Sequence, residues 1–397
     1  MESSRIITYL TEHILADALY EDGKLMELSL NPAEETSLLG SIYVGKVKKI
    51  VKNIQAAFVE IQPSMLCYLP LEEAKNPIYV KPKKQPKLIE GDELLVQVSR
   101  EAVKTKAPSV TSNISLNGKY LVLTTGNRMI GYSAKLKPSE KTSIKEVIDA
   151  WEIPEVGLIV RTNARSAKAE ELQEEYQKLL SEYQFLVQQA IHRSVYSCVR
   201  KSRPSYLTSI LGSRSEQLKE IVTDDAKLYQ EILEFLTEEM PKDTEKLRLY
   251  KDQALPLKAL YRMEKGMQDA LAERVWLHSG AYLVIEPTEA LTVIDVNTGK
   301  YTGGKDKQQT IQKINKEATY EIARQLRLRN LSGIILVDFV DMEDEKAKQE
   351  LLQLMRELLK KDPQKAAAVD LTALGLMELT RKKQKKTLLE QAKECGI

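Results

Sequence analysis

Residues 290–338 of the chain are ALTVIDVNTGKYTGGKDKQQTIQKINKEATYEIARQLRLRNLSGIILVD, and they set the first expectation for the fold. The two ends, ALTVIDVN and GIILVD, are short runs rich in apolar and β-branched residues, which predict strands. A Gly-containing loop and a helix-forming stretch up to Arg329 lie between them. Strand, loop, helix and strand in this order predict a β-α-β unit whose strands are parallel and joined by a right-handed crossover.

Two aspartates lie toward the carboxyl ends of these strands, Asp295 in the first and Asp338 at the end of the second. In open α/β sheets ligands gather at the carboxyl ends of the strands, so the two side chains could converge there. With the amide of Asn297 they offer oxygen ligands of the kind that hold Mg²⁺, which can activate water for attack on a phosphodiester. The alternative interpretation is that strand-ending aspartates only cap turns or helix N-termini, and spacing alone does not decide between the two.

A second motif overlaps the first. Residues Gly299 to Asp306 match G-x-x-x-x-G-K, placed after a strand and before a helix as a phosphate-binding loop requires. The next position should be a Ser or Thr, whereas here it is Asp306, and a carboxylate would repel phosphate. A P-loop-like nucleotide hydrolase is therefore the second candidate. Other hydrolase motifs are missing: the chain has no G-x-S-x-G and no paired C-x-x-C, and its three histidines are His13, His192 and His278.

The composition is that of a multi-domain globular protein. At 397 residues, with 43% hydrophobic and 29% charged residues, the chain is long enough for two to four domains. No window approaches the ~18 consecutive apolar residues of a spanning helix, and the first residues carry no export signal, so we expect no membrane association. Three scattered cysteines, at 67, 198 and 395, suit a reducing compartment, and we expect a cytoplasmic protein.

Short strands dominate the N-terminal region. Residues 14–30 predict a hairpin around Glu21-Asp22-Gly23-Lys24. Residues 41–61, 65–71 and 91–103 then predict the strands of a small closed barrel of the OB type. In this barrel Phe58 and Tyr68 could stack on bases while Lys46, Lys48, Lys49 and Lys106 follow a phosphate backbone, which leaves a non-catalytic RNA-binding protein as a third candidate. The alternative is that Phe58 belongs to the core and the lysines only face solvent.

The middle of the chain carries less chemical information. Residues 112–160 predict further strands, of which VGLIV ends in the polar triplet Arg161-Thr162-Asn163. Apolar residues at three- to four-residue spacing predict one long amphipathic helix from Ser166 to about Arg200. Residues 203–258 alternate between helical and strand-like patterns without a chemical motif.

Several runs closely resemble the ribonuclease E/G family. They are ALTVIDVNTG, the run NKEATYEIARQLRLRNLSGIILVDFVDM at 315–342, and GLMELTRKK at 375–383. The resemblance extends back through VGLIVRT and AAFV to the N-terminal hairpin, so it covers almost the whole chain. It implies an α/β multi-domain (α+β) protein, in which an RNase H-like fold carries an inserted OB-type RNA-binding barrel and a 5′-sensor region and is followed by a DNase I-like catalytic subdomain. The implied domains are an RNase H-like fold in two segments, 1–37 and 206–270, with the OB-type barrel at 38–110, the 5′-sensor region at 111–205 and the DNase I-like subdomain at 271–397.

The resemblance also implies a function. The family cuts single-stranded RNA internally with Mg²⁺, is stimulated by a 5′-monophosphate, and acts in the processing of rRNA and the decay of mRNA. Carried over to this chain, the site residues are Asp295 and Asp338 as metal ligands, with Asn297 completing the catalytic group. The RNA-binding positions are Phe58, Tyr68 and Lys106, with Tyr68 in place of a usual Phe. The 5′-phosphate pocket comprises Arg161, Thr162, Gly118 and Val122.

The sequence departs from the family pattern at its C-terminal end. After TRKK the family usually continues into a C-P-x-C segment that binds zinc between protomers, whereas here only Cys395 follows. A structural zinc site needs about four Cys or His ligands, so we expect no structural zinc and no zinc-linked dimer. Cys67 in the predicted barrel and Cys198 in the predicted long helix are expected to be small buried hydrophobic residues.

Overall fold

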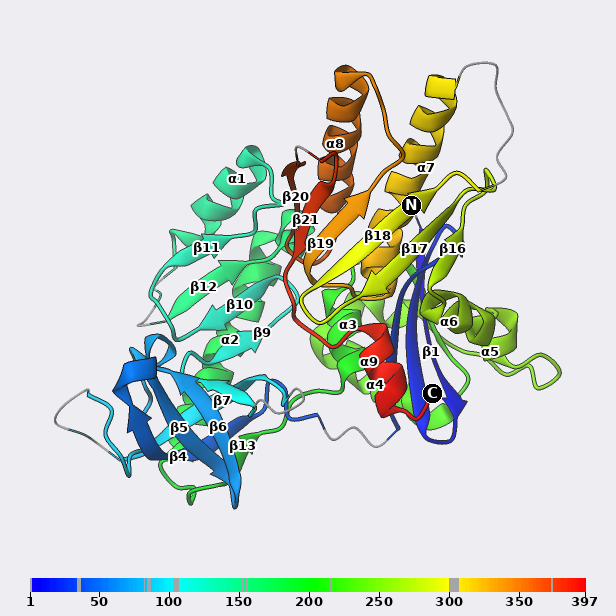
Figure 1. Cartoon of the computed structure of the whole chain (residues 1–397). Helices are drawn as coiled ribbons and strands as arrows, with labels where there is room; N and C mark the ends of the chain where they lie inside the picture. The colour runs from blue at the N-terminus through cyan, green and yellow to red at the C-terminus, as the bar shows by residue number, and fades with distance from the viewer. Residues whose placement is uncertain are drawn as a thin grey trace. The chain divides into compact units, whose positions relative to one another are not determined.

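The structure is a computed structural model that describes residues 2–33, 37–81, 83, 87–102, 107–151, 153, 156–214, 216–299, 307–372 and 374–397 (Figure 1). The chain forms two compact units. Unit 1 comprises Met1–Glu34, Glu216–Glu234 and Asp243–Ile397, and unit 2 comprises Glu35–Ser215 and Phe235–Lys242. Within the described ranges, no helix has the length and apolar character needed to cross a membrane.

The first sheet of unit 1 has the strand order β15-β14-β1-β2-β3. Its N-terminal strands β1 (Ser3–Thr11), β2 (Ile14–Glu21) and β3 (Lys24–Pro32) are antiparallel, while β14 (Leu218–Thr223) and β15 (Leu247–Leu249) run parallel to β1. The predicted hairpin is confirmed: β2 and β3 are joined by Asp22 and Gly23, with φ of 48° and 76°. Two successive positive φ angles are what a tight two-residue hairpin turn needs, and Asp and Gly adopt them readily.

Short helices pack with this first sheet. They are α5 (Leu257–Leu260), α6 (Met263–Leu271) and α9 (Leu388–Glu394), with side chains from all three in one core cluster with β1, β2 and β3. Residues 257–271 thus form two short helices instead of one. The break falls at Arg262, whose φ of 48° is left-handed and ends α5 before α6 begins. Helix α4 (Ala226–Glu239) follows β14, and η4 (Pro241–Lys246) leads into β15.

The second sheet of unit 1 contains the β-α-β unit. Its strand order is β16-β17-β18-β19-β21-β20. The predicted parallel pair is confirmed as β18 (Leu291–Asn297) and β19 (Gly333–Asp338), joined through α7 (Lys307–Leu328). The remaining elements are β16 (Arg274–Trp276), β17 (Tyr282–Pro287), α8 (Glu345–Leu359), β20 (Ala366–Leu371) and β21 (Met377–Arg381).

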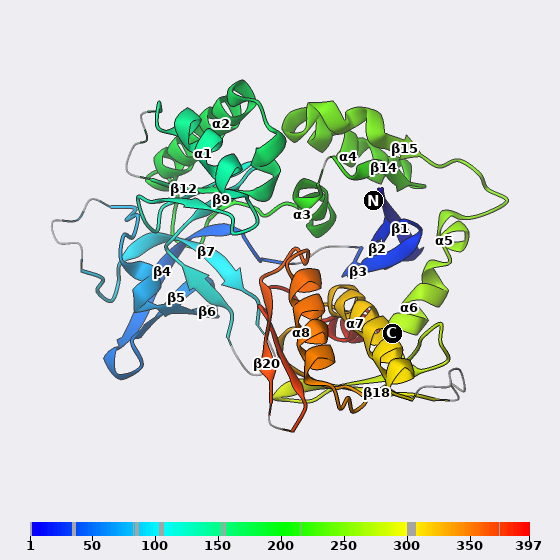
Figure 2. The same ribbon diagram turned by 90° about the horizontal axis from the view of Figure 1, so that it is seen from above.

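Helices α7 and α8 cover one face of this second sheet, as Figure 2 shows from above. On that face Ile294 and Val296 of β18 pack in one core cluster with Ile314, Ala318 and Ile322 of α7. The alternate residues of the same strands point to the opposite face. No described helix of unit 1 lies on that opposite face in Figures 1 and 2, and we call it the open face.

Unit 2 contains a closed barrel, as the sequence predicts. Strands β4 (Ile42–Val51), β5 (Ala56–Gln62), β6 (Met65–Pro70), β8 (Ser109–Thr111) and β7 (Glu93–Arg100) pair in this order, and β7 pairs back with β4. Five strands closed in this way form an OB-like barrel. The 3-10 turns η1 (Lys52–Ile54) and η2 (Leu71–Ala74) connect its strands. Cys67 is buried in its core as expected, and this burial raises the pKa of the thiol to about 11.

The other half of unit 2 is a sheet with the strand order β11-β12-β10-β9. Its strands are β9 (Ser115–Asn117), β10 (Leu121–Thr124), β11 (Ile130–Tyr132) and β12 (Gly157–Val160), with α1 (Pro138–Ile148), η3 (Thr162–Ser166), α2 (Ala169–Ala190) and α3 (Ser205–Gly212) beside them. The prediction of strands throughout 112–160 was wrong for α1. That helix begins at Pro138, and the Glu140 carboxylate accepts a hydrogen bond from the backbone N–H of the N-cap Lys137.

The predicted long helix is shorter than expected. It ends at Ala190, and Cys198 lies in the strand β13 (Cys198–Arg200), which pairs with β4. Between them Tyr196 takes a left-handed backbone with φ of 73°, which a helix cannot continue through. The expectation that Cys198 is buried was wrong, because its residue is exposed.

Candidate functional site

Asp295 and Asp338 lie directly opposite each other on neighbouring strands. In the parallel register of β18 and β19, Asp295 is the partner of Asp338. Neighbouring strands are about 4.8 Å apart, so the two carboxylates start from adjacent backbone positions. Both residues are exposed, because the buried residues of the two strands are the alternate ones that face α7 and α8. The strand alternation therefore places the acidic pair on the open face.

The electrostatics of the pair fit a site for a cation. Although Asp338 is an exposed residue, partial desolvation of its carboxyl raises the pKa, and the nearby negative charges of Asp295 and Asp341 raise it further. Asn297, two positions after Asp295 and on the same face, donates a hydrogen bond from Nδ2 to Oδ2 of Asp295 at 2.6 Å. This hydrogen bond uses the amide nitrogen of Asn297 and not its amide oxygen. Two crowded carboxylates beside an amide oxygen form a set of hard ligands that a divalent cation would stabilise.

The structure adds two residues that the sequence motifs did not single out. Asp341 follows Asp338 at a spacing of three, a pattern visible in the text DFVD, and its charge acts on Asp338. Asn315 of α7 is fully buried and holds the backbone of Val340, just beyond the end of β19. Across the described residues, no three His, Cys, Asp or Glu side chains come close enough to hold a metal ion as a cluster.

The phosphate-loop motif can be followed only at its start. The segment from residue 300 to 306 lies outside the described residues, so the P-loop-like interpretation is untested there. Gly299 itself has a φ of 58°, and a Cβ at this position would stand 2.4 Å from the carbonyl oxygen of Gly280. The glycine is thus explained by a close backbone approach.

Phe58 and Tyr68 form a pair on the barrel. They are direct partners in the antiparallel register of β5 and β6, with ring centroids 6.2 Å apart in an edge-on arrangement. Both are half-buried, whereas their neighbours Ala57 and Val59 belong to the barrel core. Phe58 is therefore not a core residue, and the pair presents aromatic surface on the outside of the barrel. Lys106, the third predicted RNA-binding position, lies outside the described residues.

Arg161 and Gly118 are brought together in the second sheet of unit 2. The Arg161 guanidinium donates from Nη1 to the carbonyl oxygen of Gly118 at 2.5 Å, and burial lowers the pKa of Arg161. The Thr162 hydroxyl lies 3.0 Å from that of Ser133. Val122 lies in β10, and Leu121 beside it is the register partner of Val160, the residue before Arg161. Gly118 and Val122 thus lie on the β9–β10 hairpin, beside the end of β12 that leads into Arg161 and Thr162.

Glu175 of α2 completes this region and was not predicted. Its carboxylate accepts hydrogen bonds from three consecutive backbone N–H groups, those of Lys119, Tyr120 and Leu121, at 2.7 to 2.8 Å. Burial raises the pKa of Glu175, against the lowering effect of these N–H groups and of Arg161. The signal in the sequence is a charged residue at 175 on the same helix face as the buried Leu172 and Leu179.

The chain is similar in sequence to known ribonucleases. The sequence model described as "Ribonuclease E/G family" matches residues 115–384. Ribonuclease G of Haemophilus influenzae is 32% identical, over 98% of this chain and 81% of its own length. Ribonuclease G of Escherichia coli K12 is 31% identical, over 94% of this chain and 78% of its own length. Ribonuclease E of Haemophilus influenzae is 30% identical over 94% of this chain, which spans 41% of that longer protein.

Proposed function

The chain belongs to the ribonuclease E/G family. We propose that it is a Mg²⁺-dependent endoribonuclease that cuts single-stranded RNA in a site containing Asp295 and Asp338. The relatives to which it is similar over nearly its whole length are named ribonucleases. This similarity supports an endoribonuclease in RNA processing or decay. The single observation that carries the proposal of a site is the register that sets Asp295 opposite Asp338 on the open face.

The fit of a metal rests on the charges of the pair. Two carboxylates on adjacent strands repel each other, and the raised pKa of Asp338 is a consequence of partial desolvation and of this repulsion. A divalent cation bound by both oxygens would replace the repulsion with attraction, which favours the ionised form of each. Mg²⁺ is typically held by one or two carboxylates and keeps its other positions for water and phosphate. Asp295 and Asp338 would hold it in this way.

Each residue then has a role in the reaction. When bound, Mg²⁺ supplies a water of lowered pKa and offsets charge on the phosphate. Asp295 and Asp338 fix the position of the site on two adjacent strands of one sheet. Asn297, held by its hydrogen bond to Asp295, keeps its amide oxygen available to the ligand set or to the groups around the scissile phosphate. Asn315 keeps the chain after Asp338 in place through the backbone of Val340.

The finer features of the fold are proposals as well. We assign the OB-type RNA-binding barrel to 38–110 and the 5′-sensor region to 111–205, in line with the closed barrel and the separate four-stranded sheet of unit 2. The sheet formed by β1–β3 with β14 and β15 supports an RNase H-like fold built from 1–37 and 206–270. The sheet β16–β21 with α7 and α8 supports a DNase I-like subdomain at 271–397.

Substrate binding outside the catalytic pair follows from unit 2. A guanidinium and a hydroxyl are suitable ligands for a terminal phosphate, and we assign a 5′-monophosphate to Arg161 and Thr162 beside Gly118 and Val122. The aromatic pair of Phe58 and Tyr68, with Lys106, is assigned to single-stranded RNA. Both assignments predict that cleavage depends on the 5′ end and on an unpaired strand.

Incubation of the purified protein with a 5′-monophosphorylated single-stranded RNA, in Mg²⁺ and in EDTA, tests the function. Internal cuts in Mg²⁺ that disappear in EDTA, and in Asp338→Asn protein, are the expected result. Nucleotide turnover without RNA cuts would instead indicate the phosphate-loop hydrolase. Tight RNA binding without cuts in any metal would indicate a non-catalytic RNA-binding protein.

A further inference from the structure

Two rows of side chains cross the open face from its edge strand to the acidic pair. In the first row, Arg274 of β16 is opposite Val284 of β17, which is opposite Asp295 of β18. In the second row, Trp276 of β16 is opposite Tyr282 of β17, which is opposite Asn297 of β18. Residues paired directly across a sheet share a face. The β16 edge and the acidic pair therefore belong to one continuous surface.

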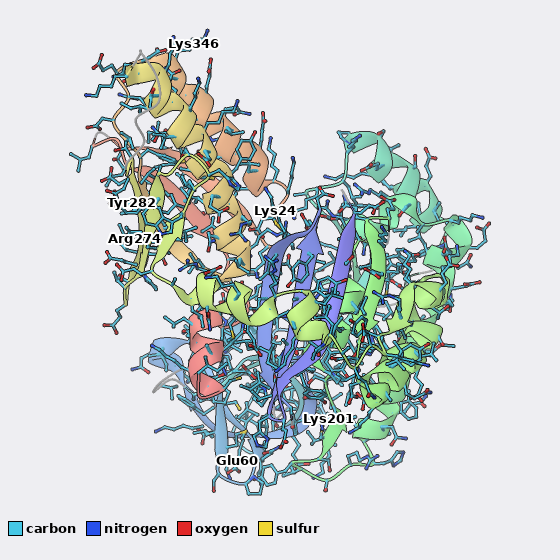
Figure 3. The ribbon with its side chains drawn as sticks, turned by 90° about the vertical axis from the view of Figure 1, so that its right-hand side faces the viewer. Lys24, Glu60, Lys201, Arg274, Tyr282 and Lys346 are labelled. Atoms are coloured by element: carbon cyan, nitrogen blue, oxygen red, sulfur yellow. The ribbon has the colours of Figure 1, made fainter. Side chains whose placement is uncertain are left out.

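The edge of this surface is aromatic and cationic. The indole of Trp276 lies 5.1 Å from the Tyr282 ring, measured between centroids, with the two planes at 54°. The Arg274 guanidinium lies over the Tyr282 ring, 4.6 Å from its centroid, and Figure 3 labels these two residues side by side at this edge. Trp276 is 64% exposed, although tryptophan is mostly buried in folded proteins. Its ring is thus supported from one side by Tyr282 and accessible from another.

These groups match what a flexible single strand of RNA offers. Every nucleobase has a flat face that stacks on an indole whatever its identity, and its phosphate attracts a guanidinium. The distance to the acidic pair also fits. Strand β16, with Arg274 and Trp276, lies two strand spacings, about 10 Å, from Asp295 and Asn297 of β18, because neighbouring strands are about 4.8 Å apart. A base on Trp276 would belong to the same RNA segment as the phosphate at the acidic pair.

We propose that Trp276 is a stacking platform for a nucleobase that flanks the scissile phosphate, with Tyr282 as its positioning residue and Arg274 as the contact to the neighbouring backbone phosphate. The inference rests on the proposed endoribonuclease function and adds a base subsite to it. The occupant is single-stranded RNA rather than a protein, because the same face continues without a break into the acidic pair and carries a cation at the edge.

Kinetic variants measure the contribution of the platform. Trp276→Ala is expected to lower kcat/KM on single-stranded RNA by roughly 5- to 100-fold, the effect of losing one base stack. Trp276→Phe should restore most of the loss. Tyr282→Ala should act in the same direction and Tyr282→Phe should not, since the ring and not the hydroxyl supports Trp276. Tyr320→Ala is the matched control: Tyr320 is also an exposed aromatic of unit 1, but it lies on α7, the helix that covers the other face.

An abasic scan of the substrate identifies the base. The test uses a set of RNAs, each with one abasic site near the mapped cut. At one position the missing base should lower the cleavage rate of the parent enzyme but not that of Trp276→Ala. If Trp276→Ala keeps the parent's sensitivity at every position, the platform is wrong while the endoribonuclease stands. If the parent makes no cut, the proposed function is wrong, and the platform is then judged by binding alone.

Tryptophan fluorescence gives that binding measurement. The chain has two tryptophans, and Trp151 is stacked on the buried Tyr176 of unit 2. In a Trp151→Phe background the emission comes from Trp276, and rapid mixing with single-stranded RNA in Mg²⁺ should quench it, whereas a fully abasic strand should not. Absence of quenching at RNA concentrations that saturate binding would overturn the inference. So would light scattering that shows a dimer which Trp276→Ala dissociates, because a second copy would then cover the ring.

Discussion

Asn315 and Val340 are joined by two hydrogen bonds, although 25 positions separate them in the chain. The Asn315 side chain donates from Nδ2 to the Val340 carbonyl oxygen at 2.7 Å and accepts from the Val340 N–H at 3.1 Å. Asn315 is fully buried in α7, and Val340 comes two positions after Asp338. A helix of the β-α-β unit thus fixes the segment that follows the second aspartate.

We predict that Asn315→Asp and Asn315→Ala lower both stability and cleavage. The aspartate loses the donor to Val340 and the alanine loses both bonds, and a buried polar group left without a partner costs about 1–3 kcal/mol. Urea unfolding and initial cleavage rates would measure the two effects, with Lys316→Ala, an exposed neighbour on α7, as the control. Parent-like rates in both Asn315 variants would show that the position of the segment after Asp338 does not matter for catalysis.

Asp295→Asn and Asp338→Asn should each remove cleavage while leaving folding and RNA binding nearly unchanged. Each change deletes a charged metal ligand and keeps the shape of the side chain, so the expected loss is at least on the order of 10²-fold in rate, or ~2.7 kcal/mol of barrier. Rates at saturating Mg²⁺ and RNA affinity by filter binding measure it. Glu286→Gln, an exposed acid of β17, is the control. Near-normal rates in both aspartate variants would contradict the two-aspartate site.

Arg161→Ala should flatten the preference for a 5′-monophosphate. A terminal phosphate can accept charge-assisted hydrogen bonds from the guanidinium that a 5′-hydroxyl cannot, so the parent should cut the phosphorylated RNA faster. The measurement is the ratio of initial rates on the same RNA with each 5′ end. Arg165→Ala, an exposed arginine in the same turn, should keep the parent's ratio. Unchanged discrimination in Arg161→Ala would place the pocket elsewhere.

Gly118→Ala should destabilise unit 2 through Glu175. A Cβ on residue 118 would stand 2.4 Å from Oε1 of Glu175, and φ at this position gives no reason of its own for glycine. The carboxylate would have to leave the three N–H groups it binds, at a cost of about 1–3 kcal/mol for each that stays buried. A double-mutant cycle by urea unfolding tests this: Gly118→Ala should cost much less in a Glu175→Ala background than in the parent. Equal costs would contradict the coupling.

The sequence predicts the features of the site that depend on local patterns. The apolar runs at 290–297 and 333–338 predict parallel strands, and the strand alternation then brings Asp295 and Asp338 to one face. It cannot predict contacts whose partners are backbone groups far along the chain. Asn315 bonds to Val340, and Glu175 bonds to the N–H groups after Gly118. Both contacts depend on how a helix packs against the end of a strand, and the spacing of residues along the sequence does not specify that packing.

The same distinction explains the errors at the end of α2 and at Cys198. The chain leaves α2 and forms a strand at Cys198 because this segment pairs with β4. A local sequence pattern does not predict a pairing with such a distant segment. The stacking platform at Trp276 could not be predicted either, because it depends on the pairing of β16 with β17 that brings Trp276 beside Tyr282. Helix α1 is an error of another kind, because its start signal, Pro138 with Glu140, is local and readable in the sequence.

Glu27 forms ion pairs with Arg327 and Arg5 where the first sheet contacts α7. Nη2 of Arg327, in the last turn of α7, donates at 2.8 Å both to Glu27 of β3 and to Glu21 of β2. Burial alone would raise the pKa of Glu27, but the charges of Arg327 and Arg5 outweigh it and hold the pKa below its usual value. The ionised carboxylate is therefore the form that the folded state favours.

We predict that this contact makes the stability of unit 1 sensitive to acid. A carboxyl whose pKa is lowered by folding contributes stability that is fully present above its unfolded pKa, near 4.5, and is lost as the pH falls through the lower folded value. Glu27→Gln should thus lower the free energy of unfolding at pH 7 by about 1.5–3 kcal/mol, the range for hydrogen bonds to charged groups. The gap to the parent should close as the pH drops below about 4.5, because protonation removes the same interaction from the parent. Urea unfolding from pH 7 down to the acid limit of folding measures the gap, and Glu12→Gln, an exposed residue of the turn between β1 and β2, should follow the parent throughout. A gap for Glu27→Gln that stays constant across this range would show that the ionised carboxylate does not stabilise the fold.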